Sequence, residues 1–108
     1  MGKKENEFQA GLIKELKERF PGAMVLKNDA NYIQGIPDLT VLYGNCWAAL
    51  ECKKESSASK RPNQAYYISR MNEMSFASFI YPENKEEVLN DLERSFEICR
   101  KACAVKPK

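Results

Sequence analysis

The stretch that decides the fold is residues 36–53, which read IPDLTVLYGNCWAALECK. Two runs rich in apolar, β-branched and aromatic residues, 36–43 and 46–53, lie on either side of Gly44 and Asn45. A two-residue connection of this type between such runs is typical of a β-hairpin. We therefore expect two antiparallel strands here.

Side chains alternate between the two faces of a strand, so the second run sorts its residues by parity. Glu51 and Lys53 share one face, and Asp38 lies at a similar distance from the turn on the first strand. We expect Asp38 and Glu51 to be cross-strand neighbours, about 5–6 Å apart. The opposite face carries only apolar residues and suits a core: Cys46, Ala48, Leu50 and Cys52.

The rest of the chain predicts helices and strands around this hairpin. Apolar residues at three-to-four spacing indicate helices, Pro62 suits a first helical position, and Asn84 with Glu87 resembles a capping signal. The expected helices are 5–20, 62–74 and one after Asn84, and the further strands are 23–27 and 75–81. The order α-β-β-β-α-β-α predicts one α/β domain over 1–108, with a mixed sheet flanked by helices, a core over 5–103 and a basic tail at 104–108.

Length, charge and composition exclude several classes of protein. A chain of 108 residues suits one domain, and a balance of 17 − 15 = +2 is too even for a histone-like polycation. No apolar run approaches a membrane span, and the first residues lack a signal-peptide pattern, so we expect a cytoplasmic protein without a membrane partner.

The absence of histidine and the spacing of the cysteines limit the chemistry further. With 0 histidines, the chain has no His-based triad, zinc ligand or general base. The cysteines are Cys46, Cys52, Cys99 and Cys103, and their spacing is not that of paired zinc knuckles. We expect reduced thiols that act as small apolar residues, with a four-thiolate zinc site as the less favoured alternative.

The residues that carry chemistry are Asp38, Glu51 and Lys53. Two close carboxylates repel each other unless a cation lies between them, and carboxylate oxygens are ligands for Mg²⁺. A lysine beside them is placed to orient or deprotonate a water, or to stabilise charge on a phosphate. Each fragment alone has a simpler interpretation: an Asp at a strand start, or an exposed Glu-x-Lys ion pair.

The chain also resembles a known family over residues 5–81. Gly35-Ile36-Pro37-Asp38 followed by Glu51-Cys52-Lys53 is similar to the PD-(D/E)xK nuclease signature. Within that superfamily the chain resembles the VRR-NUC (virus-type replication-repair nuclease) branch, and Arg61-Pro62-Asn63-Gln64 fits the helix that opens near a Gln. The resemblance implies a restriction-endonuclease-like core and a DNA nuclease that depends on Mg²⁺ or Mn²⁺.

The resemblance also implies roles for individual residues. Asp38, Glu51 and the backbone carbonyl of Cys52 would hold the metal, and Lys53 would be the catalytic lysine. An acidic residue of the first helix would join them. Glu5 falls inside the apolar stripe of that helix and Glu7 on the opposite face, so Glu5 is either this residue or a solvated charge in the first turn.

Other polar residues near the site have two interpretations each. Gln64 would hold a water or the phosphate, or is an ordinary exposed helical residue. The basic residues that would contact DNA phosphates, or are plain surface charges, are Lys27, Lys54, Lys60 and Arg61.

These observations predict a structure-specific endonuclease that cuts branched DNA such as a Holliday junction, as a homodimer. The crowding of large apolar residues over 66–79 favours the dimer. The alternatives are a nickase, restriction-type enzyme or exonuclease, and a catalytically silent DNA-binding relative. The small size suits a phage product with a part in DNA repair or DNA processing.

Overall fold

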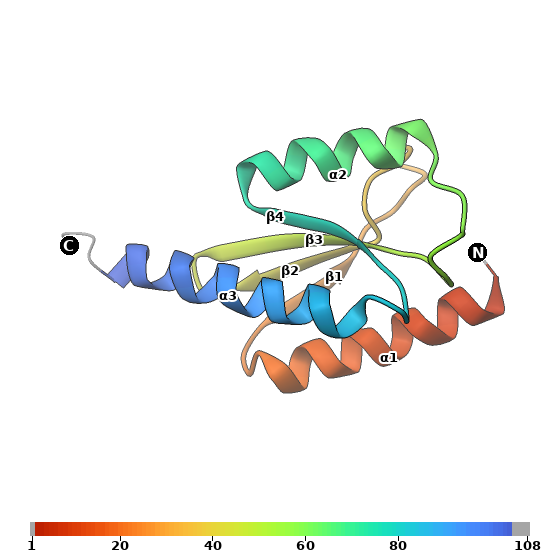
Figure 1. Cartoon of the computed structure of the whole chain (residues 1–108). Helices are drawn as coiled ribbons and strands as arrows, with labels where there is room; N and C mark the ends of the chain where they lie inside the picture. Colours follow the sequence, from red (N-terminus) through yellow and green to blue (C-terminus); the bar gives the residue numbers. More distant parts are fainter. Residues whose placement is uncertain (1, 105–108) are drawn as a thin grey trace.

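The computed structural model describes residues 2–104, with side chains through residue 102, and its elements follow the predicted α-β-β-β-α-β-α order. Residues 105–108 of the predicted basic tail and the side chain of Cys103 lie outside the described part. The elements are α1 (Lys3–Arg19), β1 (Met24–Lys27), β2 (Leu39–Tyr43), β3 (Cys46–Cys52), α2 (Pro62–Met74), β4 (Phe76–Ile80) and α3 (Lys85–Ala104) (Figure 1).

The sheet has the order β1-β2-β3-β4, with β4 parallel to β3 and the other neighbours antiparallel. The predicted hairpin is confirmed: Tyr43 pairs with Cys46 beside the turn, and Leu39 pairs with Leu50. This register puts the residue before β2, Asp38, next to Glu51.

The core lies between one face of the sheet and the helices α1 and α3, which both run beneath it in Figure 1. The predicted parity of β3 is confirmed, because Cys46, Ala48, Leu50 and Cys52 are all buried in this core. The helix α2 covers the opposite face over β3 and β4, and none of its residues is buried. No helix in the described part of the chain has the length and apolar character needed to cross a membrane.

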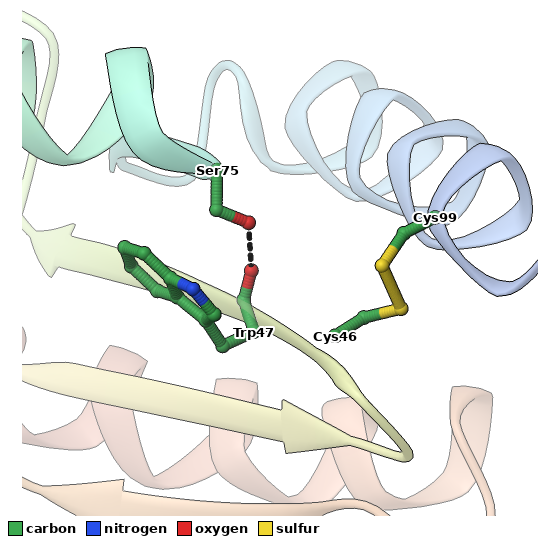
Figure 2. Close-up of a disulfide and its surroundings, with 4 residues drawn as sticks. All are labelled: Cys46, Trp47, Ser75 and Cys99. Atoms are coloured by element: carbon green, nitrogen blue, oxygen red, sulfur yellow. Dashed lines mark hydrogen bonds between the residues drawn. A yellow bond between two sulfur atoms is a disulfide. The ribbon is translucent and has the colours of Figure 1, made fainter. Parts of the chain in front are cut away.

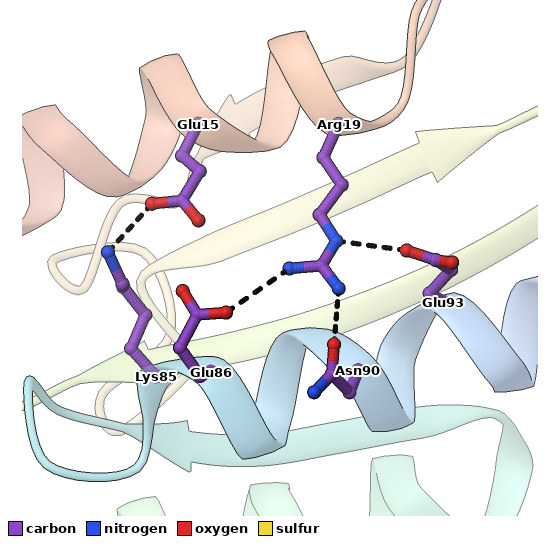
Figure 3. Close-up of polar contacts among 6 residues, drawn as sticks. All are labelled: Glu15, Arg19, Lys85, Glu86, Asn90 and Glu93. Carbon is purple, nitrogen blue, oxygen red and sulfur yellow. Dashed lines mark hydrogen bonds and ion pairs between the residues drawn. The ribbon is translucent and has the colours of Figure 1, made fainter.

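Polar side chains join the two core helices at their solvent edge (Figure 3). Arg19 on α1 donates hydrogen bonds to Glu93 at 3.0 Å and to Asn90, both on α3. Lys85 at the start of α3 donates to Glu15 on α1 at 2.7 Å. Each partly exposed pair contributes at most about 1 kcal/mol to stability. The main effect of these contacts is therefore to fix how α1 and α3 are aligned with each other.

The cysteines correct the prediction of reduced thiols, because Cys46 and Cys99 form a disulfide (Figure 2). The bridge joins the first residue of β3 to α3 across 53 residues of sequence, with the two Cα atoms 6.1 Å apart. Closing a loop of this length stabilises a fold by about 4 kcal/mol in the chain-entropy account. Beside it, the hydroxyl of Ser75 donates to the carbonyl of Trp47, which ties the end of α2 to β3. Cys52 is a free, buried thiol, as predicted.

Two local predictions need correction. The strand expected over 36–43 begins only at Leu39, because Pro37 has no N–H to donate and the residues before it form a loop. The helix α3 begins directly after Asn84 as predicted, but the side chain of Asn84 turns back to β4. It accepts from the N–H of Tyr81 at 2.8 Å and donates to the carbonyl of Phe79 at 3.2 Å.

Candidate active site

Two carboxylates face each other where β2 begins and β3 ends. Glu51 is 4% exposed, and its Oε1 accepts from the backbone N–H of Asp38 at 3.1 Å. Asp38 in turn accepts through Oδ2 from the backbone N–H of Cys52 at 2.9 Å. The hairpin register therefore locks each carboxylate to the backbone of the opposite strand, as the spacing from the turn predicts.

Buried Lys53 and half-buried Gln64 complete a chain of polar contacts beside this pair. Lys53 is 7% exposed, lies 3.9 Å from Glu51 (Nζ to Oε2), and donates to Gln64 Oε1 at 2.8 Å. Gln64 donates from Nε2 to Glu51 Oε2 at 3.0 Å and accepts from the N–H of Arg61 at 3.1 Å. Gln64 thus connects the first turn of α2 to the end of β3, a link between Lys53 and Glu51 that the sequence does not predict.

Burial and like charge govern the electrostatics of the carboxylates. Burial, and then the charge of Asp38, raise the pKa of Glu51 to about 8. Burial also raises the pKa of Asp38, against the hydrogen bond from Cys52. A raised pKa means that ionising the carboxyl group is unfavourable in free energy. A cation bound beside the carboxylate would stabilise the ionised form.

The first helix brings Glu5 toward the site and leaves Glu7 exposed. Glu5 is half-buried, and its charge is one of the causes that raise the pKa of both Asp38 and Glu51. One turn later, the buried side chain of Gln9 lies beside the thiol of Cys52. The preference for Glu5 over Glu7 on geometric grounds therefore agrees with the placement of the two side chains.

A pocket of about 330 Å³ opens in front of the carboxylates. Its walls come from the loop between β1 and β2 and from the start of α2, with Gln34, Gly35, Asp38, Glu51, Arg61 and Gln64 among the lining residues. Asn28 holds the two ends of the loop together: its N–H donates to the carbonyl of Asp38 at 2.8 Å, and its side chain donates to the carbonyl of Pro37 at 2.8 Å. The sequence marks this segment only as turn-rich and polar.

The predicted DNA-contacting residues separate into two groups. Arg61 lines the pocket, and Lys60 lies over the rings of Phe79 and Tyr81 at 5.4 and 5.7 Å from their centroids. Phe79 is the direct β4 neighbour of Glu51. Lys60, Lys27 and Lys54 are all exposed side chains outside the pocket lining.

The donor set at this site fits a hard divalent cation of the Mg²⁺ type. Within the described residues no group of three or more acidic or cysteine side chains is gathered to hold a metal. The protein ligands available are thus the carboxylates of Asp38 and Glu51, with the adjacent carbonyl of Cys52, while Glu5 as a further ligand stays a prediction. Mg²⁺ commonly binds one or two carboxylates and completes its shell with water and phosphate oxygens.

Comparison with known proteins identifies a relative of this architecture. A solved structure described as "VRR_NUC domain" superposes with a TM-score of 0.60 and 27% sequence identity, covering 85% of this chain and 97% of that chain. No protein-family model and no curated protein matches the chain.

The chain is an α/β domain, and its fold together with this relative supports a nuclease of the PD-(D/E)xK type. Within that class the chain is similar to the VRR-NUC domain, and the resemblance that the sequence motifs predicted is confirmed.

Proposed function

We propose that this protein is a divalent-metal-dependent DNA endonuclease that hydrolyses phosphodiester bonds, with branched DNA as its preferred substrate. The observation that carries the proposal is the pair of half-buried Asp38 and buried Glu51 beside Lys53, with both carboxylates lining a pocket that Arg61 also lines. We place the reaction in the cytoplasm, where such a substrate is accessible.

The residues divide the work of hydrolysis between them. Asp38, Glu51 and the carbonyl of Cys52 would hold the metal ion. A bound Mg²⁺ or Mn²⁺ would supply Lewis acidity and neutralise charge on the phosphate. Lys53 would orient the attacking water, accept its proton as the neutral amine, or as the ammonium stabilise the charge that develops on the phosphate oxygens. Gln64 would keep the Nζ of Lys53 directed at this point, and Arg61 and Lys60 would contact neighbouring phosphates.

The test compares cleavage of a four-way junction, a linear duplex and a single strand by the wild-type protein, with Mg²⁺ and with a chelator. We expect metal-dependent cutting of the junction and its loss in Asp38→Asn and in Glu51→Gln, which remove a charged ligand at nearly constant size. Glu18→Gln is the matched control, because it makes the same change at an exposed carboxylate of α1. Wild-type rates in either carboxylate variant at saturating Mg²⁺ would refute the assigned site.

We further propose that the enzyme acts as a homodimer through α2 and the adjacent outer face of the sheet. Supporting this, α2 has no buried residue, and its Tyr66 and Met74 are 58% and 62% exposed. On β1, Met24 is 59% exposed. Exposed apolar groups gathered on one face are typical of an interface, and a two-fold axis would pair two active sites for a symmetric junction.

Sedimentation at micromolar concentration tests the dimer. We expect about twice the 12.4 kDa of the chain, and dissociation in Met74→Lys. Ile98→Lys on α3 is the control, because Ile98 is equally exposed at 67% on a different helix. A wild-type monomer that still cuts junctions symmetrically would refute the interface.

A further inference from the structure

Tyr32 is the most exposed large apolar or aromatic side chain in the described part of the chain, at 84%. Single exposed apolar side chains are common on protein surfaces, so exposure alone assigns no role. The position of Tyr32 is what distinguishes it. It lies in the loop between β1 and β2, between Ala30 and Gln34, which both line the pocket in front of the carboxylates.

The loop that carries Tyr32 is held in place by its own hydrogen bonds. Asp29 organises its first turn, accepting from the N–H of Asn31 through Oδ1 at 2.8 Å and from the N–H of Tyr32 through its carbonyl at 3.0 Å. At the other end, Gly35 lies so close to Asn63 that a Cβ there would come within 2.4 Å of the Asn63 Cβ. The ring is therefore presented from an anchored loop, so little conformational entropy is lost when it binds.

An exposed aromatic ring at the rim of a nucleic-acid pocket has a specific physical use. A nucleobase offers a free face to such a ring only where it is unpaired or unstacked, since in intact duplex both faces are covered by neighbouring bases. Stacking is tolerant of base identity because every base has a π-face. The phenol hydroxyl is not needed for this contact.

We propose that Tyr32 stacks on an unpaired nucleobase next to the phosphate that is cut at the site of Asp38 and Glu51. The substrate class that follows is DNA with unpaired or splayed bases beside the cut, as at a branch point or a gap. Tyr32 is thus a specificity-determining residue. This inference rests on the proposed nuclease function and narrows its substrate.

The experiment measures binding in EDTA of two probes: a duplex with a short gap that contains 2-aminopurine, and the same duplex without the gap. For Tyr32→Ala we expect gapped-probe binding weaker by about 5- to 100-fold, equivalent to about 1–3 kcal/mol, with intact-duplex binding changed less than about twofold. The quenching of 2-aminopurine by the wild-type ring should disappear in Tyr32→Ala and persist in Tyr32→Phe. Asn31→Ala, a truncation of the neighbouring exposed side chain, should behave as wild type.

The outcomes separate this inference from the function on which it rests. Equal weakening on both probes, or a Tyr32→Phe variant as weak as Tyr32→Ala, would overturn the stacking role while leaving the nuclease intact. The stacking role is also overturned if junction cleavage depends on Asp38 but Tyr32→Ala binds the gapped probe as wild type does. If the wild-type protein neither binds nor cuts any DNA, both the proposed function and this inference fall.

Discussion

The contact between Gly35 and Asn63 allows a sharp test of how the pocket is built. Gly35 has φ +90°, and a Cβ at this position would meet the Cβ of Asn63 at 2.4 Å and its carbonyl carbon at 2.9 Å. Gly22, after α1, has the same φ of +90°, but a Cβ there would meet no atom within 4 Å. Replacing each glycine by alanine therefore separates backbone strain from the steric contact.

Both substitutions carry the cost of placing alanine at a positive φ. Only Gly35→Ala adds a steric clash with Asn63. An alanine in the left-handed region costs about 1–2 kcal/mol relative to glycine. Forcing a methyl group into a filled space adds typically 1–3 kcal/mol, so we expect a loss of about 2–5 kcal/mol for Gly35→Ala and about 1–2 kcal/mol for Gly22→Ala. Replacing a glycine also lowers the entropy of the unfolded chain, which favours folding; this effect applies to both variants and cancels in the comparison.

Urea unfolding of the two variants and the wild type measures this difference, provided that the m-values agree. Because the contact holds the β1–β2 loop against α2, Gly35→Ala should also slow DNA cleavage, whereas Gly22→Ala should not. The double variant Gly35→Ala with Asn63→Gly should recover part of the loss, since only the Cβ contact is removed. Equal losses in the two single variants would refute the close approach of the loop to α2.

Three further predictions concern the carboxylate site. Lys53→Ala should lose single-turnover cleavage and keep DNA and metal binding, because its role lies in the transition state; lost DNA binding with intact chemistry would instead make Lys53 a phosphate contact. Cys52→Ser should lose about 1–3 kcal/mol, because the change places a hydroxyl in the apolar core; native Cys52 should resist thiol labelling, and rapid labelling would contradict the strand parity. In EDTA, the free energy of unfolding should fall as pH rises from about 4.5 to 8, because folded Glu51, with its pKa near 8, holds a proton that the unfolded chain has released. The slope should reach at most about 1.4 kcal/mol per pH unit and flatten in Glu51→Gln, and a slope unchanged in that variant would assign the titration to another group.

The sequence predicts those parts of the site that depend on local periodicity. The hairpin turn and the two-residue alternation suffice to bring Asp38 beside Glu51 and to send Cys52 to the other face, since the tight turn sets the register and a one-residue slip would expose the apolar face. The side of α1 that carries Glu5 follows in the same way from helical spacing. These relations connect residues within one element or across one tight turn.

The parts that the sequence does not predict are contacts between elements distant along the chain. The disulfide needs the start of β3 and the middle of α3 to meet, and the spacing of Cys46 and Cys99 contains no information on that distance. The same holds for the approach of Gly35 to Asn63, which depends on how far α2 sits above the sheet. The motif marks Gln64 as a candidate, but its simultaneous bonds to Lys53 and Glu51 follow from tertiary packing alone.

The placement of α2 links the candidate active site to the proposed dimer. No residue of this helix is fully buried, so apolar packing contributes less to its stability than it does for most helices. Its first turn is held by the hydrogen bonds of Gln64 with Lys53 and Glu51 and by the close packing of Asn63 against Gly35. A partner that covered Tyr66 and Met74 would fix the helix from outside and, through Gln64, would fix the Lys53 ammonium beside the carboxylates. On this reasoning the proposed dimer would do more than pair two cuts, because it would restrict the motion of one wall of each candidate active site.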